Sequence, residues 1–199
     1  MCDNTSPILS NWVLNSFAKI SYFILVKMYL DSVDNMFQPP HDITKVKDAI
    51  FSHFNIEDHF GILAYAYDNF TKSNFAGLCS KIAEEANNGD ELSKWLFAEN
   101  GKWLAKHVIA LLPKMSSELL SNGLPIVTVG SVWKSWILME KGFMEELREK
   151  SKGQLKCISL IQLKVPMSVG ACYLAAKEAK IQINKRYNDN STIFFEANV

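Results

Sequence analysis

The chain has 199 residues, of which 48% are hydrophobic and 21% are charged. This length and composition are typical of a globular protein that buries a sizeable core in one domain, or in one domain and a fragment. Lys and Arg together number 21, as do Asp and Glu, so the net charge favours neither nucleic acid nor an acidic membrane as a partner.

Cysteine usage and hydrophobic runs indicate the compartment. The cysteines show no CxxC pair and no regular spacing, which predicts reduced thiols in the cytoplasm and neither a disulfide framework nor a zinc site. They are Cys2, Cys79, Cys157 and Cys172. The apolar run Ile20–Val26 is too short to span a bilayer and lies between Lys19 and Lys27, so it predicts a buried helix rather than a membrane anchor. Met1–Ser10 lacks the features of a signal peptide.

The first part of the chain has the apolar spacing of helices. In the second predicted helix Val46, Ile50 and Phe54 share one face, with Asp42 as its N-cap. Asp90 is expected to be the N-cap of the last and longest predicted helix, because the helix-breaking residues Asn88 and Gly89 precede it. The predicted helices cover Asn15–Val33, Ile43–Phe54, Asp58–Tyr67, Asn74–Ala86 and the stretch from Asp90 towards Leu112.

From residue 124 the pattern changes to alternating strands and helices. Leu124–Val129 and Cys157–Leu163 are short, apolar and bounded by Gly or Pro, which predicts two strands. Helical patterns follow each of them, over Val132–Arg148 and Ser168–Ala179. This order predicts an α/β fold in which the two strands are parallel neighbours. The tail after Ile183 is polar, which predicts partial disorder.

The turn after the first predicted strand is a candidate binding site. Gly130 permits a positive φ and lets another group approach the backbone. The N–H groups of Ser131 and Val132 are expected to begin a helix, where they could hold phosphate or ribose oxygens. Ser131 and Ser135 are four residues apart and are expected to share a helix face. Because such turns are common in α/β proteins, the spacing alone leaves plain turn geometry as an open alternative.

The residues of this segment also resemble a motif of a known protein family. Val129–Trp136 (VGSVWKSW), after an apolar strand, resembles the adenosine-side motif of eukaryotic N-acetylglucosamine kinases, within the actin-like ATPases, sugar kinases and BadF-type ATPases. Phe75–Glu84 (FAGLCSKIAE) resembles the helix start that closes over the adenine in that family. The likeness runs from about Ala18 to Lys180, and further similar stretches in the same order are Tyr29–Asn35, Pro40–Asp42 and Gly170–Ala176.

The resemblance implies a fold, a reaction and site residues. It implies an RNase H-like (actin-like ATPase) C-terminal lobe with a large helical insertion. It implies transfer of the γ-phosphoryl group of ATP to the 6-hydroxyl of N-acetylglucosamine in amino-sugar salvage, with magnesium as cofactor. By the same resemblance Ala76 would contact the nucleotide, and Gly130, Ser131 and Ser135 would line its adenosine side. A homodimer is the expected assembly.

Other motifs of that family are missing. The chain has no Gly-rich phosphate hairpin of the GxExGGT kind, no DAAG-like segment with its catalytic aspartate, and no SGTGS or GDEGS loop. We therefore assign no catalytic residue and expect a truncated form without its base and phosphate loops. Residues 1–17 would be a divergent leader, 18–165 the C-terminal lobe, and 166–199 a C-terminal helix and tail that normally pack on the missing lobe.

Two further hypotheses stay open at this point. The chain could be a non-catalytic binding or dimerisation module derived from the lobe, or a decaying fragment without a selected role. Without its partner lobe, the last predicted helix is expected to have one face exposed or repacked, and exposed apolar surface of this kind favours association. The residues of that face are Val169, Cys172, Tyr173 and Ala176.

Overall fold

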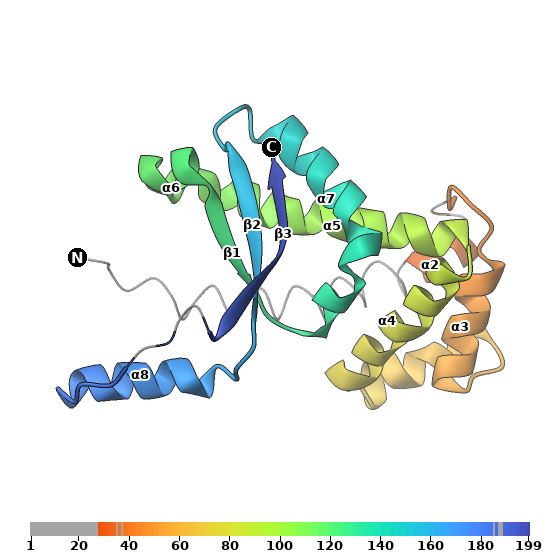
Figure 1. Cartoon of the computed structure of the whole chain (residues 1–199). Helices are drawn as coiled ribbons and strands as arrows, with labels where there is room; N and C mark the ends of the chain where they lie inside the picture. Colours follow the sequence, from red (N-terminus) through yellow and green to blue (C-terminus); the bar gives the residue numbers. More distant parts are fainter. Residues whose placement is uncertain (1–27, 35, 37, 185, 187–188) are drawn as a thin grey trace. The chain divides into compact units, whose positions relative to one another are not determined.

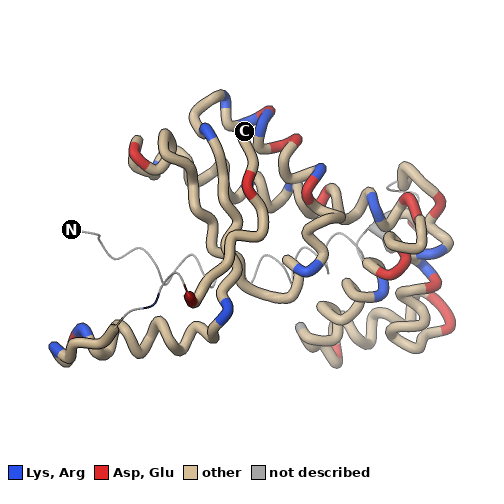
Figure 2. The backbone as a smooth tube through the Cα atoms, in the orientation of Figure 1, with Lys and Arg blue, Asp and Glu red and all other residues tan. Residues whose placement is uncertain are grey.

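The structure is a computed structural model that describes residues 28–34, 36, 38–184, 186 and 189–199 (Figure 1). The predicted leader, the run Ile20–Val26 and most of the first predicted helix lie outside the described residues. Within the described part of the chain, no helix is long and apolar enough to cross a membrane. Acidic and basic residues are mixed along the chain, as the alternating colours on helix α7 (Trp136–Lys150) illustrate (Figure 2). Two compact units are described separately below: the residues up to Ala105 with Lys134–Glu145, and Lys106–Trp133 with Glu146–Val199.

The first unit begins with three helices, α2 (Met28–Val33), α3 (Thr44–Phe54) and α4 (Lys72–Asn87). The predicted inner face of α3 is confirmed, because its three apolar residues are at most 1% exposed. Asp42 precedes α3, and its Oδ1 accepts hydrogen bonds from the backbone N–H (3.3 Å) and the hydroxyl (2.9 Å) of Thr44. The Asp42 carboxylate therefore satisfies the first backbone N–H of the helix, but it does so from one residue before the N-cap position, which Ile43 occupies.

The predicted continuous helix over Asp58–Tyr67 is interrupted. It consists of a 3₁₀ turn, η2 (His59–Gly61), and a π-helical turn, η3 (Ala64–Asp68). The Asp58 carboxylate accepts a hydrogen bond from the Gly61 N–H at 3.0 Å, so a side chain closes the first turn. The second turn is closed by Asn69 N–H, which donates to Ala64 C=O at 2.8 Å, five residues back. These side-chain and i→i+5 bonds replace the i→i+4 pattern that periodicity predicted.

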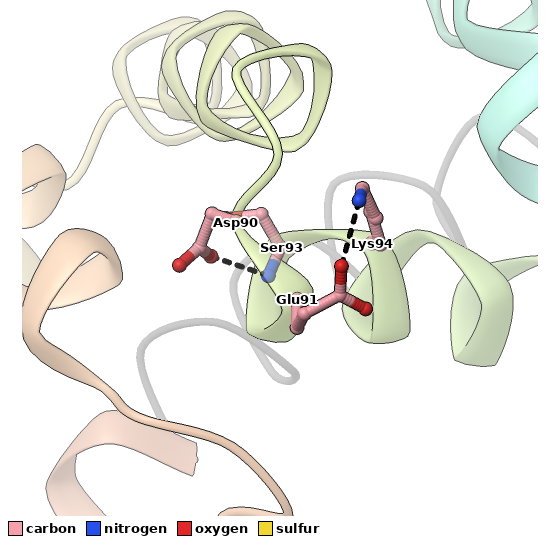
Figure 3. Close-up of polar contacts among 4 residues, drawn as sticks. All are labelled: Asp90, Glu91, Ser93 and Lys94. Carbon is pink, nitrogen blue, oxygen red and sulfur yellow. Dashed lines mark hydrogen bonds and ion pairs between the residues drawn. The ribbon is translucent and has the colours of Figure 1, made fainter.

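Helix α5 (Glu91–Leu111) begins as the sequence indicated. Gly89, with φ +101°, ends the preceding turn, and Asp90 Oδ2 accepts a hydrogen bond from the backbone N–H of Ser93 at 2.7 Å (Figure 3). One turn further on, Lys94 Nζ lies 2.7 Å from Glu91 Oε1 (Figure 3). The predicted N-cap at Asp90 is therefore confirmed.

Helices α5 and α7 cross with their backbones in contact in the first unit. A Cβ placed on Gly101 would lie 2.8 Å from Phe143 N, and one on Gly142 would lie 2.6 Å from Ala98 C. Beside this crossing Met139 is fully buried, and its Sδ accepts a hydrogen bond from Asn100 Nδ2 at 3.7 Å. Two glycines thus let two helices approach more closely than any side chain would allow.

The second unit is built on a three-stranded sheet in the order β1-β2-β3 (Figure 1). The strands are β1 (Leu124–Thr128), β2 (Cys157–Leu163) and β3 (Ser191–Asn198). The two predicted strands and their parallel pairing are confirmed, with Leu124 opposite Ile158. The predicted disorder of the tail is wrong where β3 lies, because that segment pairs antiparallel with β2. The chain is therefore mixed α/β, with a small mixed sheet.

The two faces of this sheet differ in burial. Ile158 and Leu160 on β2 are fully buried on one face. On the other face Val127, Ile161 and Ile193 lie opposite one another across the three strands, and the two outer members are about half exposed. The sheet thus has a packed face and a face with an apolar row that reaches the surface.

The remaining helices of this unit are α6 (Ser117–Asn122), which the sequence did not predict, and α8 (Ser168–Glu178). No side chain of α8 is buried, and Leu174 is 66% exposed. The four apolar residues that were expected on an exposed face, including Cys172 and Tyr173, are all partly or fully exposed. Tyr173 Oη accepts a hydrogen bond from Asn190 Nδ2 at 3.1 Å, which ties the returning chain to this helix.

Candidate functional site

The end of β1 is fixed by a buried hydroxyl that sequence reasoning missed. Thr128 is 5% exposed, and its Oγ1 donates to the backbone carbonyl of Ile161 on β2 at 3.0 Å. This bond and the parallel ladder hold the last residue of β1 in register. The position of the following turn therefore depends on Thr128, whose β-branched side chain the sequence identified only as a strand former.

The predicted turn at Gly130 is confirmed in its backbone. Gly130 has φ +106°, a conformation that costs little only for glycine. It is exposed, and a Cβ built on it would meet no atom within 4 Å. Since none of the described residues occupies this space, a ligand group could approach the backbone here as closely as the sequence predicted.

The predicted helix start after this turn has a different geometry. Ser131–Ser135 forms a 3₁₀ helix, η5, and α7 begins only at Trp136. A 3₁₀ helix turns by about 120° per residue, so residues four apart point about 120° away from each other. The prediction that Ser131 and Ser135 share one face is therefore wrong. The five residues of η5 also offer little of the dipole on which the predicted phosphate contact at Ser131 and Val132 depended.

Ala76 lies in the first part of α4, where it is exposed between the buried residues Phe75 and Leu78. An unpredicted residue supports this part of the helix. His53 of α3 places Nε2 2.8 Å from the carbonyl oxygen of Asn74, and a Cβ on Gly77 would lie 3.1 Å from His53 Cε1. No local spacing could have indicated this contact, because His53 and Asn74 are 21 residues apart.

The four predicted site residues do not form one site within either unit. Gly130 and Ser131 are adjacent at the end of β1 in the second unit, whereas Ala76 and Ser135 belong to the first. What the described geometry offers is an open turn at Gly130 with one exposed hydroxyl residue, Ser131, beside it.

This turn has a donor set that does not suit magnesium. Mg²⁺ prefers carboxylate and phosphate oxygens, and the sequence from Gly123 to Met139 contains no Asp or Glu. Among the described residues, no group of three or more His, Cys, Asp or Glu side chains could hold a metal ion. We therefore derive no step through a metal at this turn. The described residues Cys157 and Cys172 are free thiols.

No model of a known protein family matches the sequence. The family resemblance of the turn and of α4 is therefore carried by the residues quoted above alone.

Proposed function

We propose that the chain is an N-acetylglucosamine kinase-like protein that keeps the adenosine-binding side of the family's C-terminal lobe and lacks the parts that transfer phosphate. In this proposal residues 18–165 are the actin-like lobe and 166–199 its C-terminal helix and tail. The complete family enzyme phosphorylates the 6-hydroxyl of N-acetylglucosamine with ATP and magnesium in the cytoplasm. This chain binds the adenosine part of ATP and does not catalyse the transfer by itself.

The observation that carries this proposal is the open turn at Gly130. β1 delivers the chain to it, Thr128 fixes the end of the strand, and Gly130 takes a backbone conformation with free space where a side chain would stand. A flat base or a ribose could contact the exposed backbone there, with the Ser131 hydroxyl as a donor or acceptor. Ala76 is exposed at the start of α4 and stays a predicted nucleotide contact on the family resemblance alone.

The absence of transfer follows from the chemistry that the reaction needs. A kinase of this type needs a base for the acceptor hydroxyl and cations to offset the phosphate charge. The stretch from Gly123 to Met139, which contains the turn, has no carboxylate side chain, and its one charged residue is Lys134. We therefore assign no catalytic residue and propose binding as the activity that remains.

Calorimetric titration of the purified chain with adenosine and with ATP and magnesium tests the proposal. Gly130→Ala places a Cβ in the open space, and we expect it to weaken adenosine binding at least about tenfold. Gly153→Ala is the matched control, because Gly153 also has a positive φ (+72°) and no atom within 4 Å of an added Cβ. It introduces similar backbone strain and should leave binding unchanged. Absence of binding by the folded chain, or equal loss in both variants, would contradict the proposal.

A coupled assay with ATP, magnesium and N-acetylglucosamine tests the predicted lack of transfer. We expect no turnover above background beside an active family kinase as positive control. Turnover that disappears in Ser131→Ala would contradict the predicted lack of transfer, since it would mean that other residues supply the phosphate site.

One observation favours a second function, a dimerisation module. No residue of helix α8 is buried, and its apolar side chain Leu174 is 66% exposed. Burial of such a surface drives association. Sedimentation equilibrium should show a dimer that Leu174→Glu weakens, whereas a monomer at tens of micromolar, a concentration at which a dimer with micromolar Kd would form, counts against this function.

A further inference from the structure

Three large apolar side chains lie exposed from η2 to η3, between α3 and α4. Phe60 is 65% exposed, Leu63 43% and Tyr67 79%. They are three and four residues apart along η2 and η3, so they lie on the same side of this coiled segment. We call Phe60, Leu63 and Tyr67 the apolar stripe.

The opposite side of the same segment is packed, so the stripe is not the result of a loose loop. Ile62 is fully buried. The ring of Tyr65 lies against that of Phe54, with their centroids 5.1 Å apart. Since the buried side fixes the orientation of the segment, the stripe is presented outward by a defined structure.

The segment that carries the stripe is acidic. Residues 55–71 contain Glu57, Asp58 and Asp68, all exposed, and no Lys or Arg. The ring of His59 lies against that of Phe60, with centroids 4.0 Å apart. A complementary occupant therefore combines apolar side chains with cations at its ends.

Helix α2 precedes this segment in the chain and packs against α3. Tyr29, in α2, is 3% exposed, and its ring lies edge-on to that of Phe51 at 5.9 Å. Burial, and then the negative charge of Asp58, raise the pKa of Tyr29 above its ordinary value. Since Phe51 and Phe54 both belong to α3, and Phe54 contacts Tyr65, α2 and the segment with the stripe pack on the same helix.

The sequence just before α2 has the required chemistry. Residues 19–27 read Lys-Ile-Ser-Tyr-Phe-Ile-Leu-Val-Lys, an apolar run with a lysine at each end. They lie outside the described residues. Ile20 is nine residues from Tyr29, a stretch that can span up to about 30 Å, so the run can reach the stripe.

We propose that residues 19–27 of this chain cover the apolar stripe, with Ile20, Phe23 and Ile24 against its side chains. Lys19 and Lys27, at the two ends of this run, have the opposite charge to the exposed carboxylates of the segment. This docking is independent of nucleotide binding. The proposed docking explains why the first unit has a defined apolar surface: a segment nearby in the sequence, with basic ends, covers it.

Photocrosslinking of the full chain identifies the occupant directly. Benzoylphenylalanine replaces Tyr67, where an exposed ring tolerates the change, and the crosslinked peptides are mapped in a mixture of ¹⁴N- and ¹⁵N-labelled chains. The expected product joins position 67 to residues 19–27 of the same isotope. A mixed-isotope product would assign the stripe to a second copy and overturn the proposal. Crosslinks to another segment, or reaction with solvent only, would overturn it too. The same probe at Leu174, 66% exposed on α8, is the control and should not capture residues 19–27.

Limited trypsin digestion gives an independent readout. In the unaltered chain, cleavage after Lys19 and Lys27 should be slower than after Lys152, which is exposed in the loop after α7. Tyr67→Ser should accelerate cleavage at Lys19 and Lys27 about tenfold, because it removes apolar contact area. Leu174→Ser, a comparable change on α8, should not. Cleavage of the unaltered chain as rapid at Lys19 and Lys27 as at Lys152 would contradict the docking.

Discussion

Gly142 is the position where a single added carbon should do most damage to the helical unit. It faces α5 at the crossing with α7, and a Cβ there would lie 2.6 Å from the carbonyl carbon of Ala98 and 3.0 Å from its Cα, with the carbonyl oxygen closer still. The colliding atoms are backbone, so no side-chain rotation can relieve the contact. We therefore choose Gly142→Ala as the perturbation.

The expected magnitude is the difference between two opposing effects. Carbon atoms normally approach to about 3.5 Å, so the helices must separate by about 1 Å at Ala98. Overpacking of this kind costs up to about 3 kcal/mol. Alanine regains about 1 kcal/mol over glycine through its helix propensity. The free energy of unfolding should thus fall by about 2 kcal/mol, as the clash outweighs the propensity.

Urea unfolding, followed by tryptophan fluorescence and far-ultraviolet circular dichroism, measures this loss. Trp136 is a suitable probe because it is buried and lies against Phe143, with ring centroids 5.2 Å apart. Gly170→Ala is the matched control, since Gly170 lies within α8 and an added Cβ there meets no atom within 4 Å. It should cause no loss of stability. If Gly142→Ala is as stable as the unaltered chain, the close backbone approach of α5 and α7 is wrong.

Two further predictions concern single side chains. Asp90→Ala should lower the free energy of unfolding by about 1 kcal/mol in the same urea assay, because the first turn of α5 loses its cap, whereas Asp90→Asn should restore most of it. In an ultraviolet titration Tyr29 should ionise above the ordinary value of 10.0, first because of burial and then because of Asp58. A raised pKa in the folded state means that its contribution to stability is complete below pH 10 and is lost as the pH rises through the folded pKa. Asp58→Asn, which keeps an oxygen for the η2 cap, should lower the pKa of Tyr29 only partly; an unchanged titration would show that Asp58 is not near Tyr29.

Some parts of the fold could be read from the sequence because their signals are local. Leu124–Thr128 and Cys157–Leu163 are apolar runs bounded by Gly and Pro, and both form strands. Gly89 followed by Asp90 identified the start of α5, because the glycine conformation and the cap both act within one turn. The positive φ of Gly130 was predictable for the same reason.

Other features were beyond local reasoning because distant residues decide them. The tail after Ile183 is polar on average, and Ser191–Asn198 becomes a strand only because the edge of β2 is available for pairing. The contact of His53 with the carbonyl oxygen of Asn74 joins residues far apart in the sequence, and no local pattern in either segment predicts it. The predicted common face of Ser131 and Ser135 failed because the chain makes a 3₁₀ turn before α7.

The sequence by itself therefore determined the mixed α/β class, the two parallel strands, the ends of several helices and the glycine turn. Each of these depends on propensity, capping or backbone freedom within a few residues. The tertiary structure alone decided the third strand, the glycine crossing of α5 with α7, and which apolar side chains stay at the surface. These depend on which surfaces meet, since burial and strand pairing are settled between segments that are distant in the chain.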